Sequence, residues 1–125
     1  MVWDNYFEYP QLEVIKTKGF YHCLDVKFDA SITNNLKSLG TQAFAESNID
    51  SLNLGTCIKT IGDKCFRDCQ KLKTITIMAA EPPVLEGQLY SGNTDLEKIY
   101  VPLKSIEKYK NDSSWSVYSS KLVGI

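Results

Sequence analysis

The chain of 125 residues has no marked excess of either charge: 14 Lys and Arg residues stand against 15 Asp and Glu residues, for a net charge of −1. A protein that binds a nucleic-acid backbone normally gathers Lys and Arg into a stripe or patch, and no local run in this sequence supplies one. The sequence also lacks a run of about 18 apolar residues, which a membrane-spanning helix needs. We therefore expect no nucleic-acid partner and no membrane span.

The N-terminal sequence, MVWDNYFEYPQLEV, has neither the basic start nor the apolar run of a secretory signal. The sequence therefore predicts no signal peptide, and the compartment stays open because a mature form would lack one. With 43% hydrophobic and 23% charged residues, the composition is that of a soluble globular protein of one domain.

Histidine is scarce, and His22 in GFYHCLDV is the only one. Nucleophilic or acid–base catalysis usually needs a base beside a nucleophile, and adjacency in sequence does not bring the side chains of His22 and Cys23 together. The sequence has no G-x-S-x-G elbow, phosphate-binding glycine loop, H-E-x-x-H or calcium-loop pattern. We expect no enzyme, no catalytic residues and no cofactor.

Cysteine is too sparse for a disulfide scaffold, at about 3% against roughly 8–10% in such proteins. The even number would still allow two disulfides in three pairings. A zinc site would need the C-x₇-C-x₃-C run plus Cys23 or His22, whereas structural sites prefer tight C-x₂₋₄-C pairs. We expect mostly reduced, buried thiols and no metal at the four cysteines, Cys23, Cys57, Cys65 and Cys69.

The acidic residues are scattered, and we expect them on the solvated surface rather than in a calcium site or a carboxylate pair. Those considered are Asp25, Asp29, Asp63, Asp68, Glu81 and Glu86.

The strongest positive signal is an internal repeat of 22 to 24 residues. Residues 36–54 align with residues 58–77, and a third copy follows at residues 85–101. The agreement runs through too many hydrophobic positions to be plausible as chance. A weaker upstream copy would use Phe20, Cys23, Val26 and Phe28, with an insertion near residues 32–35.

Within each copy, apolar and polar residues alternate over a short segment, at residues 51–54, 74–77 and 98–101. Alternation is the period of a half-buried strand. A single unit cannot bury its apolar face, so the units should stack into a parallel ladder. Between strands, Gly40 or Gly62 would supply a turn, and TQAF and DKCF could begin a short helical turn capped by Thr41 or Asp63. The sequence predicts a right-handed α/β solenoid with short parallel strands and short helical or loop segments.

The pattern I-G-x-x-[AC]-F-x-x-C-x-x-L-x-x-I-x-I resembles the BspA-like leucine-rich repeats of bacterial surface proteins. The residues that carry it are Ile61, Gly62, Cys65, Phe66, Cys69, Leu72, Ile75 and Ile77. The closing segment is also similar to that of such proteins, through Pro82, Pro83, Ile99–Pro102, Tyr109, Lys110 and Trp115. The resemblance covers residues 36–118 and fits residues 1–35 poorly. It implies a leucine-rich-repeat-like fold, a cell-surface or secreted location, and adhesion or protein binding.

The repeat alignment also assigns places to two cysteines. Cys65 stands where Ala43 and Leu89 stand, which predicts a core position. Cys69 stands where Asn93 stands, a position whose side chain can bond turn backbone in leucine-rich repeats.

The tail after the last predicted strand reads as a helical cap. Pro102 can open a helix, and Leu103, Ile106 and Tyr109 recur at a spacing that gives one apolar stripe. Trp115, Tyr118 and Leu122 could continue as a second short helical stretch. We expect one domain over residues 1–125: an N-terminal degenerate repeat or cap (1–35), repeats (36–101) and a C-terminal cap (102–125). Near the start, Trp3, Tyr6, Phe7 and Tyr9 could cap the other end or form a contact patch.

The outward positions of the predicted strands form a column of hydroxyls and amides that ends in an aromatic and a cation. Repeat proteins commonly bind partners on such a face, although ordinary solvated strands show the same alternation. The sequence therefore favours a non-enzymatic module that binds a protein or a glycan. The alternative is a purely structural capping end of a longer surface repeat protein. The candidate binding face is Ser51, Asn53, Thr74, Thr76, Lys98 and Tyr100.

Overall fold

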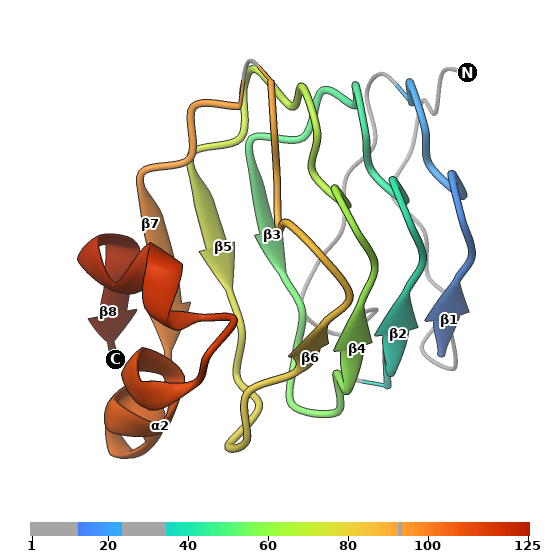
Figure 1. Cartoon of the computed structure of the whole chain (residues 1–125). Helices are drawn as coiled ribbons and strands as arrows, with labels where there is room; N and C mark the ends of the chain where they lie inside the picture. The colour runs from blue at the N-terminus through green and yellow to red at the C-terminus, as the bar shows by residue number, and fades with distance from the viewer. Residues whose placement is uncertain (1–12, 24–34, 93) are drawn as a thin grey trace.

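The computed structural model describes residues 13–23, 35–92 and 94–125, which form two four-stranded parallel sheets and a short helical region. From β3 to β7 the chain passes alternately from one sheet to the other, and successive strands of each sheet lie side by side (Figure 1). The first sheet contains β1 (Val14–Ile15), β2 (Ser38–Leu39), β4 (Thr60–Ile61) and β6 (Val84–Leu85). The second contains β3 (Ser51–Asn53), β5 (Thr74–Thr76), β7 (Lys98–Val101) and β8 (Leu122–Gly124).

The strand register in the second sheet confirms the repeat alignment. Leu52 pairs with Ile75, and Ile75 pairs with Ile99. In the first sheet, Ile61 pairs with Leu39 on one side and Leu85 on the other. The hydrophobic positions that recur along the sequence therefore lie next to one another in successive coils.

The first sheet itself is a feature that the alternation did not predict, because each of its strands has only two residues. Its first strand extends the repeats upstream, since Ile15 pairs with Leu39. Phe20 and Cys23 also belong to this first coil, and Cys23 is buried. The other residues proposed for the upstream copy and the N-terminal cap lie outside the described residues: Val26, Phe28, Trp3, Tyr6, Phe7 and Tyr9.

The segments 41–46 and 63–68 form turns, and the predicted helical turns are wrong. Gln42 and Lys64 have φ values of 53° and 54°, which an α-helix excludes. Every second N–H instead donates to the next coil: that of Gln42 to the Asp63 carbonyl at 3.0 Å and that of Phe44 to the Cys65 carbonyl at 2.9 Å. These bonds join the coils along a third side of the molecule.

The expected helix caps are therefore also wrong. Neither Thr41 nor Asp63 stands at the start of a helix, because both begin turn segments. The Asp63 carboxylate accepts a hydrogen bond from the backbone N–H of Gln88 in the following coil, at 2.9 Å from Oδ1. This side chain links two coils.

Gly40 and Gly62 are explained by close packing between coils. A Cβ atom on Gly62 would lie 2.3 Å from the backbone carbon of Gly40 and from the backbone nitrogen of Thr41. A Cβ atom on Gly40 would lie equally close to the backbone nitrogen of Thr17. These positions exclude a side chain because the neighbouring backbone leaves no room for one.

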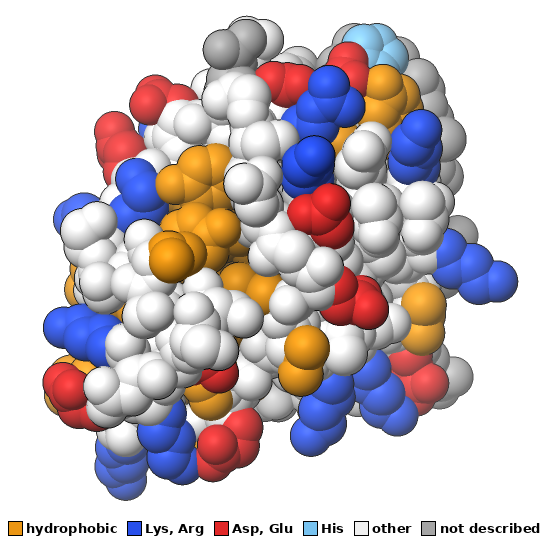
Figure 2. All heavy atoms as spheres, viewed as in Figure 1, with side chains coloured by type: hydrophobic (Ala, Val, Ile, Leu, Met, Phe, Trp, Pro, Cys, Tyr) orange, Lys and Arg blue, Asp and Glu red, His pale blue; other side chains and the backbone are white. Residues whose placement is uncertain are grey.

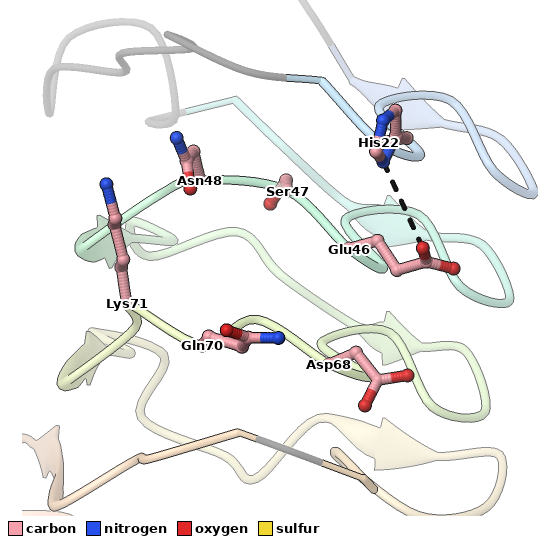
Figure 3. A pocket seen from close by; sticks show the side chains of 7 residues that line it. All are labelled: His22, Glu46, Ser47, Asn48, Asp68, Gln70 and Lys71. Carbon is pink, nitrogen blue, oxygen red and sulfur yellow. Dashed lines mark ion pairs between the residues drawn. The ribbon is translucent and has the colours of Figure 1, made fainter.

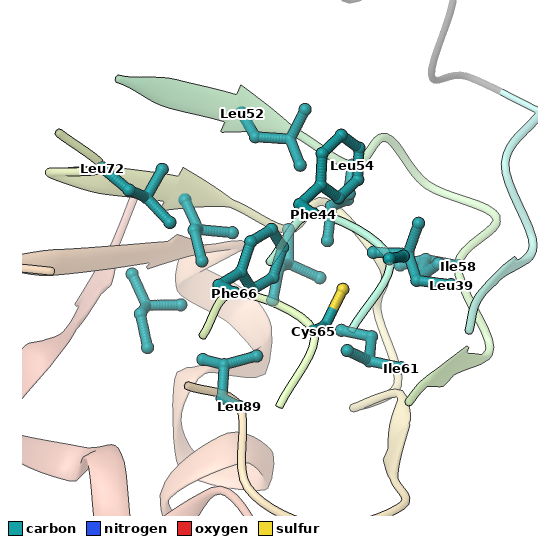
Figure 4. Packing of buried hydrophobic residues seen from close by; sticks show 14 of the residues in the cluster. Leu39, Phe44, Leu52, Leu54, Ile58, Ile61, Cys65, Phe66, Leu72 and Leu89 are labelled. Carbon is teal, nitrogen blue, oxygen red and sulfur yellow. The ribbon is translucent and has the colours of Figure 1, made fainter. Parts of the chain in front are cut away.

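The core lies between the sheets and is built from stacked positions of the repeat (Figure 4). Leu54, Ile77 and Val101 are completely buried. The N–H of Leu54 donates to the Thr76 carbonyl and that of Ile77 to the Tyr100 carbonyl. Leu54 and Ile77 directly follow β3 and β5, and Val101 is the last residue of β7, so the three residues lie at the same level of adjacent coils. The stacking on which the repeat hypothesis depends is confirmed.

The tail after β7 forms η1 (Leu103–Ser105), α2 (Ile106–Asn111) and η2 (Ser116–Lys121) and then returns as β8, which pairs in parallel with β7. The final strand was not predicted. The expected apolar stripe is only partly correct, because Tyr109 is buried while Leu103 is 65% exposed. Figure 1 shows α2 and η2 beyond β7, at the end of the stacked coils.

Aromatic side chains of this tail form hydrogen bonds with the backbone of the last coil. The Tyr109 hydroxyl donates to the Ala79 carbonyl at 2.7 Å, and the Trp115 ring N–H donates to the Pro83 carbonyl at 2.8 Å. The Tyr118 hydroxyl accepts from the N–H of Leu89 at 2.9 Å. Side-chain groups here bond backbone atoms that face away from the preceding coils, which is how a cap stabilises the end of a repeat stack.

Candidate functional site

The six residues predicted as a binding face lie together on the second sheet, in two columns. The strand register places Thr74 beside Ser51 and Lys98, and Thr76 beside Asn53 and Tyr100. Neighbouring strands are about 4.8 Å apart, so each column offers a polar group at every step. The first column has exposed ends, Ser51 and Lys98, and the second is half-buried throughout. Whether these columns bind a ligand stays a prediction.

One member of the face has a local structural role. The Asn53 side-chain carbonyl accepts a hydrogen bond from the N–H of Gly55 at 2.9 Å. Gly55 has a φ of 71°, in the region that favours glycine. Asn53 thus stabilises the turn after β3, and Thr76 and Tyr100 are better candidates for ligand contact in this column.

Charged residues lie along the edge of this face. Lys73, directly before β5, forms an ion pair with Asp95, and the ammonium group holds the pKa of the Asp95 carboxyl below its usual range. In the view of Figure 2, Lys and Arg side chains are interspersed with Asp and Glu side chains over the surface. Both signs are available to a partner.

The structure agrees with the places that the repeat alignment gave to Cys65 and Cys69. All four are free thiols; Cys57 is half-buried, while Cys23, Cys65 and Cys69 are buried. Burial raises the pKa of the Cys65 thiol above its usual range. The Cys69 thiol lies 3.0 Å from the carbonyl oxygen of Phe44, so it bonds turn backbone as expected. Among residues 13–23, 35–92 and 94–125, no three His, Cys, Asp or Glu side chains gather as metal ligands.

A polar cleft of about 420 Å³ opens beside the turn segments (Figure 3). Glu46 is held at its edge by two neighbours from the previous coil: the Tyr21 hydroxyl donates to Oε2 at 2.5 Å, and Nδ1 of His22 lies 3.9 Å from Oε1. Asp68 lies one coil further, with its Oδ2 3.3 Å from Nε of Arg67. The lining residues are His22, Glu46, Ser47, Asn48, Asp68, Gln70 and Lys71.

The sequence carried a signal for this cleft that the pattern analysis missed. His22, Glu46 and Asp68 occupy the same position of successive coils, and all three have a positive φ, between 52° and 58°. Extending the repeat alignment into the turns would have grouped Asp68 with Glu46 rather than with the scattered acids. His22 is more than half exposed while Cys23 is buried, so these neighbours face different surroundings.

Short parallel strands that recur in register, with a buried core column and an outward polar column, define a repeat protein. The chain belongs to the BspA-type leucine-rich repeat family, whose model matches residues 5–117 with six copies. The match begins well upstream of residue 36, so the family resemblance extends further towards the N-terminus than the motifs indicated. A comparison with curated proteins finds no match.

The BspA-type family is generally associated with binding rather than with catalysis. Its members generally mediate protein binding or adhesion and are typically not enzymes. In the part of the chain that the structure describes, no helix has the length and apolar character needed to cross a membrane.

Proposed function

We propose that this chain is a binding module that recognises a protein or a glycan through the outward face of its second sheet. The observation that carries the proposal is the pair of columns across β3, β5 and β7. In these columns, hydroxyl and amide side chains on β3 and β5 lie beside Lys98 and Tyr100 on β7. Tyr is enriched at interfaces because it combines a large apolar ring with a hydroxyl. Thr76 beside Tyr100 adds a hydrogen-bonding group at the distance of one strand.

The family supports the wider setting of this function. BspA-type repeats are generally associated with bacterial surfaces, and a surface protein that adheres needs an exposed, rigid face. We therefore propose a right-handed leucine-rich-repeat solenoid at the cell surface or in a secreted protein, with the coils holding the binding columns at fixed spacing.

The test is a binding screen against glycan arrays and panels of purified proteins, with Tyr100→Ala and Thr76→Ala beside the wild type. Tyr100→Ala should weaken binding of a true ligand at least about tenfold, since truncated interface tyrosines often cost 2 kcal/mol or more. Thr60→Ala is the matched control, because Thr60 is an outward threonine in the first sheet. Ligands that bind both face variants as tightly as the wild type would contradict the proposal.

A second candidate function is purely structural, as the closing end of a longer repeat array. The contacts that favour it are the bonds from Tyr109 and Trp115 to the backbone of the last coil. In this case, a chain shortened before Pro102 should self-associate through its uncovered end, as measured by light scattering. Tyr100→Ala and Thr76→Ala should then have no effect on function.

A further inference from the structure

The outward face of the first sheet carries its side chains in an order that is symmetric about the middle of the sheet. Val14 on β1 and Val84 on β6 lie at the two ends and are 49% and 62% exposed. The strand register places Ser38 of β2 and Thr60 of β4 between them. Across the four strands the column is therefore valine, serine, threonine and valine, with hydroxyl groups at its centre.

A second column on this face has opposite charges at its two ends. It consists of the residues that directly follow the paired strand residues: Lys16, Gly40, Gly62 and Glu86. Lys16 and Glu86 are exposed, and both line an open hollow of about 430 Å³ together with Gly40. Three strand spacings of about 4.8 Å put roughly 14 Å between the backbones of Lys16 and Glu86. The glycines carry no side chains, so the column is low in the middle.

The charges and valines at the ends of this face are available to a partner. Neither Lys16 nor Glu86 forms an ion pair within the described part of the chain. Covering the exposed valines removes apolar surface from water, which favours association. A partner that fits this face brings an acid to Lys16, a base to Glu86 and an apolar group to each valine. A second copy of the same face supplies all of these.

A two-fold axis that runs parallel to the strands, between β2 and β4, matches the face to a second copy with its ends exchanged. Strand β1 then faces β6 of the second copy, and β2 faces β4. Lys16 meets Glu86 of the second copy, and each contact occurs twice, as in any isologous interface. Gly40 meets Gly62, which allows close approach of the backbones. A dimer with β1 on β1 would instead bring two lysines together at one end and two glutamates at the other, which like-charge repulsion disfavours.

We propose that the outward face of the first sheet is a homodimer interface of this two-fold kind, in which Lys16 pairs with Glu86 and Val14 packs on Val84 of the second copy. The inference goes beyond the proposed binding function, because the binding face lies on the second sheet and takes no part in the dimer. Figure 1 shows the four strands of the first sheet side by side, with α2 at the end of the molecule away from β1.

The dimer is weak because the face is small. It spans three strand spacings by two or three residues, or roughly 14 by 10 Å, whereas stable complexes bury about 800 Å² per partner. At its rim the same axis brings Lys37 near Lys59 of the second copy, and the ion pair of Lys37 with Glu13, at 3.2 Å, offsets this repulsion. We therefore expect a transient dimer with a Kd of about 0.1 mM or weaker.

The test is sedimentation velocity of the whole chain under reducing conditions, so that the half-buried Cys57 cannot link two copies through a disulfide. The wild type should shift from monomer towards dimer as its concentration rises from about 10 μM to about 1 mM, the range over which such a weak dimer forms. Lys16→Glu and Glu86→Lys should each weaken dimerisation at least about tenfold, because each change replaces two attractive contacts with two repulsive ones.

Mixing the two variants tests the axis itself. Lys16→Glu leaves an acid at both ends of the face and Glu86→Lys leaves a base at both ends, so each variant repels itself and complements the other. Their equimolar mixture should recover dimer to about the wild-type level. Lys104→Glu, an exposed lysine in η1, is the matched control and should behave like the wild type.

Circular dichroism checks that each variant is folded, and recovery in the mixture cannot come from an unfolded chain. Three results would overturn the proposal. These are a wild-type mass that stays monomeric up to about 1 mM, single variants that dimerise as well as the wild type, and a mixture no more dimeric than either variant alone.

Discussion

The ring of Phe44 stacks on the ring of Phe66 in the next coil, with the ring centroids 5.7 Å apart and the planes inclined by 10°. Phe20 continues the stack on the other side of Phe44, at 5.4 Å and 8°. Phe44 and Phe66 are almost completely buried. The same residue of three successive coils thus forms a continuous column, and each ring is a packing surface for the next.

Phe66→Ala should lower the free energy of unfolding by about 3–5 kcal/mol, because it empties a core position between two coils. Urea denaturation followed by circular dichroism measures the change. Val117→Ala is the control: Val117 is 73% exposed and should shift stability by less than about 0.5 kcal/mol. Equal effects of the two substitutions would mean that Phe66 is not in the core.

Gly62→Ala should destabilise the chain by about 1–3 kcal/mol or more, the usual cost of inserting a methylene into a packed region. The added Cβ meets the backbone of Gly40 and Thr41, and backbone cannot rotate away as a side chain can. Gly87→Ala is the matched comparison, because the three atoms nearest to its added Cβ all belong to the side chain of Asp63. The melting temperature of Gly62→Ala should be well below that of Gly87→Ala. The reverse order would contradict the close approach of the coils.

The second sheet could be predicted from sequence because its strands alternate over three or four residues and carry apolar residues at matching positions of successive repeats. Leu52, Ile75 and Ile99 each sit between polar residues, and the structure pairs them as aligned. The first sheet could not be found in this way. Its strands contain only two residues, one inward and one outward, so the alternation is too short to stand out.

The turns were mispredicted because short polar segments such as TQAF favour a helix locally, whereas bonds between coils decide the outcome. Gln42 adopts a left-handed conformation and its N–H reaches the next coil. A single repeat gives no sign of that bond. The position of Glu46 and Asp68 beside one cleft follows from the same stacking, and it becomes visible only when the turns are aligned as the strands were.

Thiol reagents should distinguish Cys57 from the other cysteines. Cys57 is half-buried, whereas Cys23, Cys65 and Cys69 are completely buried, and reaction with a disulfide reagent requires access to the sulfur. Under native conditions one thiol should react quickly, and after denaturation all four should react. Cys57→Ser should abolish the fast reaction. Two or more fast thiols in the native chain would show that at least one of Cys23, Cys65 and Cys69 is accessible to solvent.

Alkaline pH should destabilise the chain through the buried Cys65 thiol. Burial raises the pKa of this thiol, while a thiol in the unfolded chain has a pKa near 8.5. Above roughly pH 8.5 the unfolded chain releases a proton that the folded chain retains, so the folded state binds more protons and its stability falls as the pH rises. The contribution is present in full below that pH and is lost as the pH rises towards the raised pKa of the folded state.

Cys65→Ala tests this dependence, because Ala43 occupies the same position one coil earlier. The variant should be less stable than the wild type at pH 7, since it leaves a small cavity. Between about pH 9 and 10 its stability should fall less steeply, by up to roughly 1.4 kcal/mol per pH unit, the value for one proton. Cys69 also has a raised pKa, so some slope should remain. Denaturation curves at several pH values give both slopes, and parallel slopes for variant and wild type would show that the Cys65 thiol is not shielded from water.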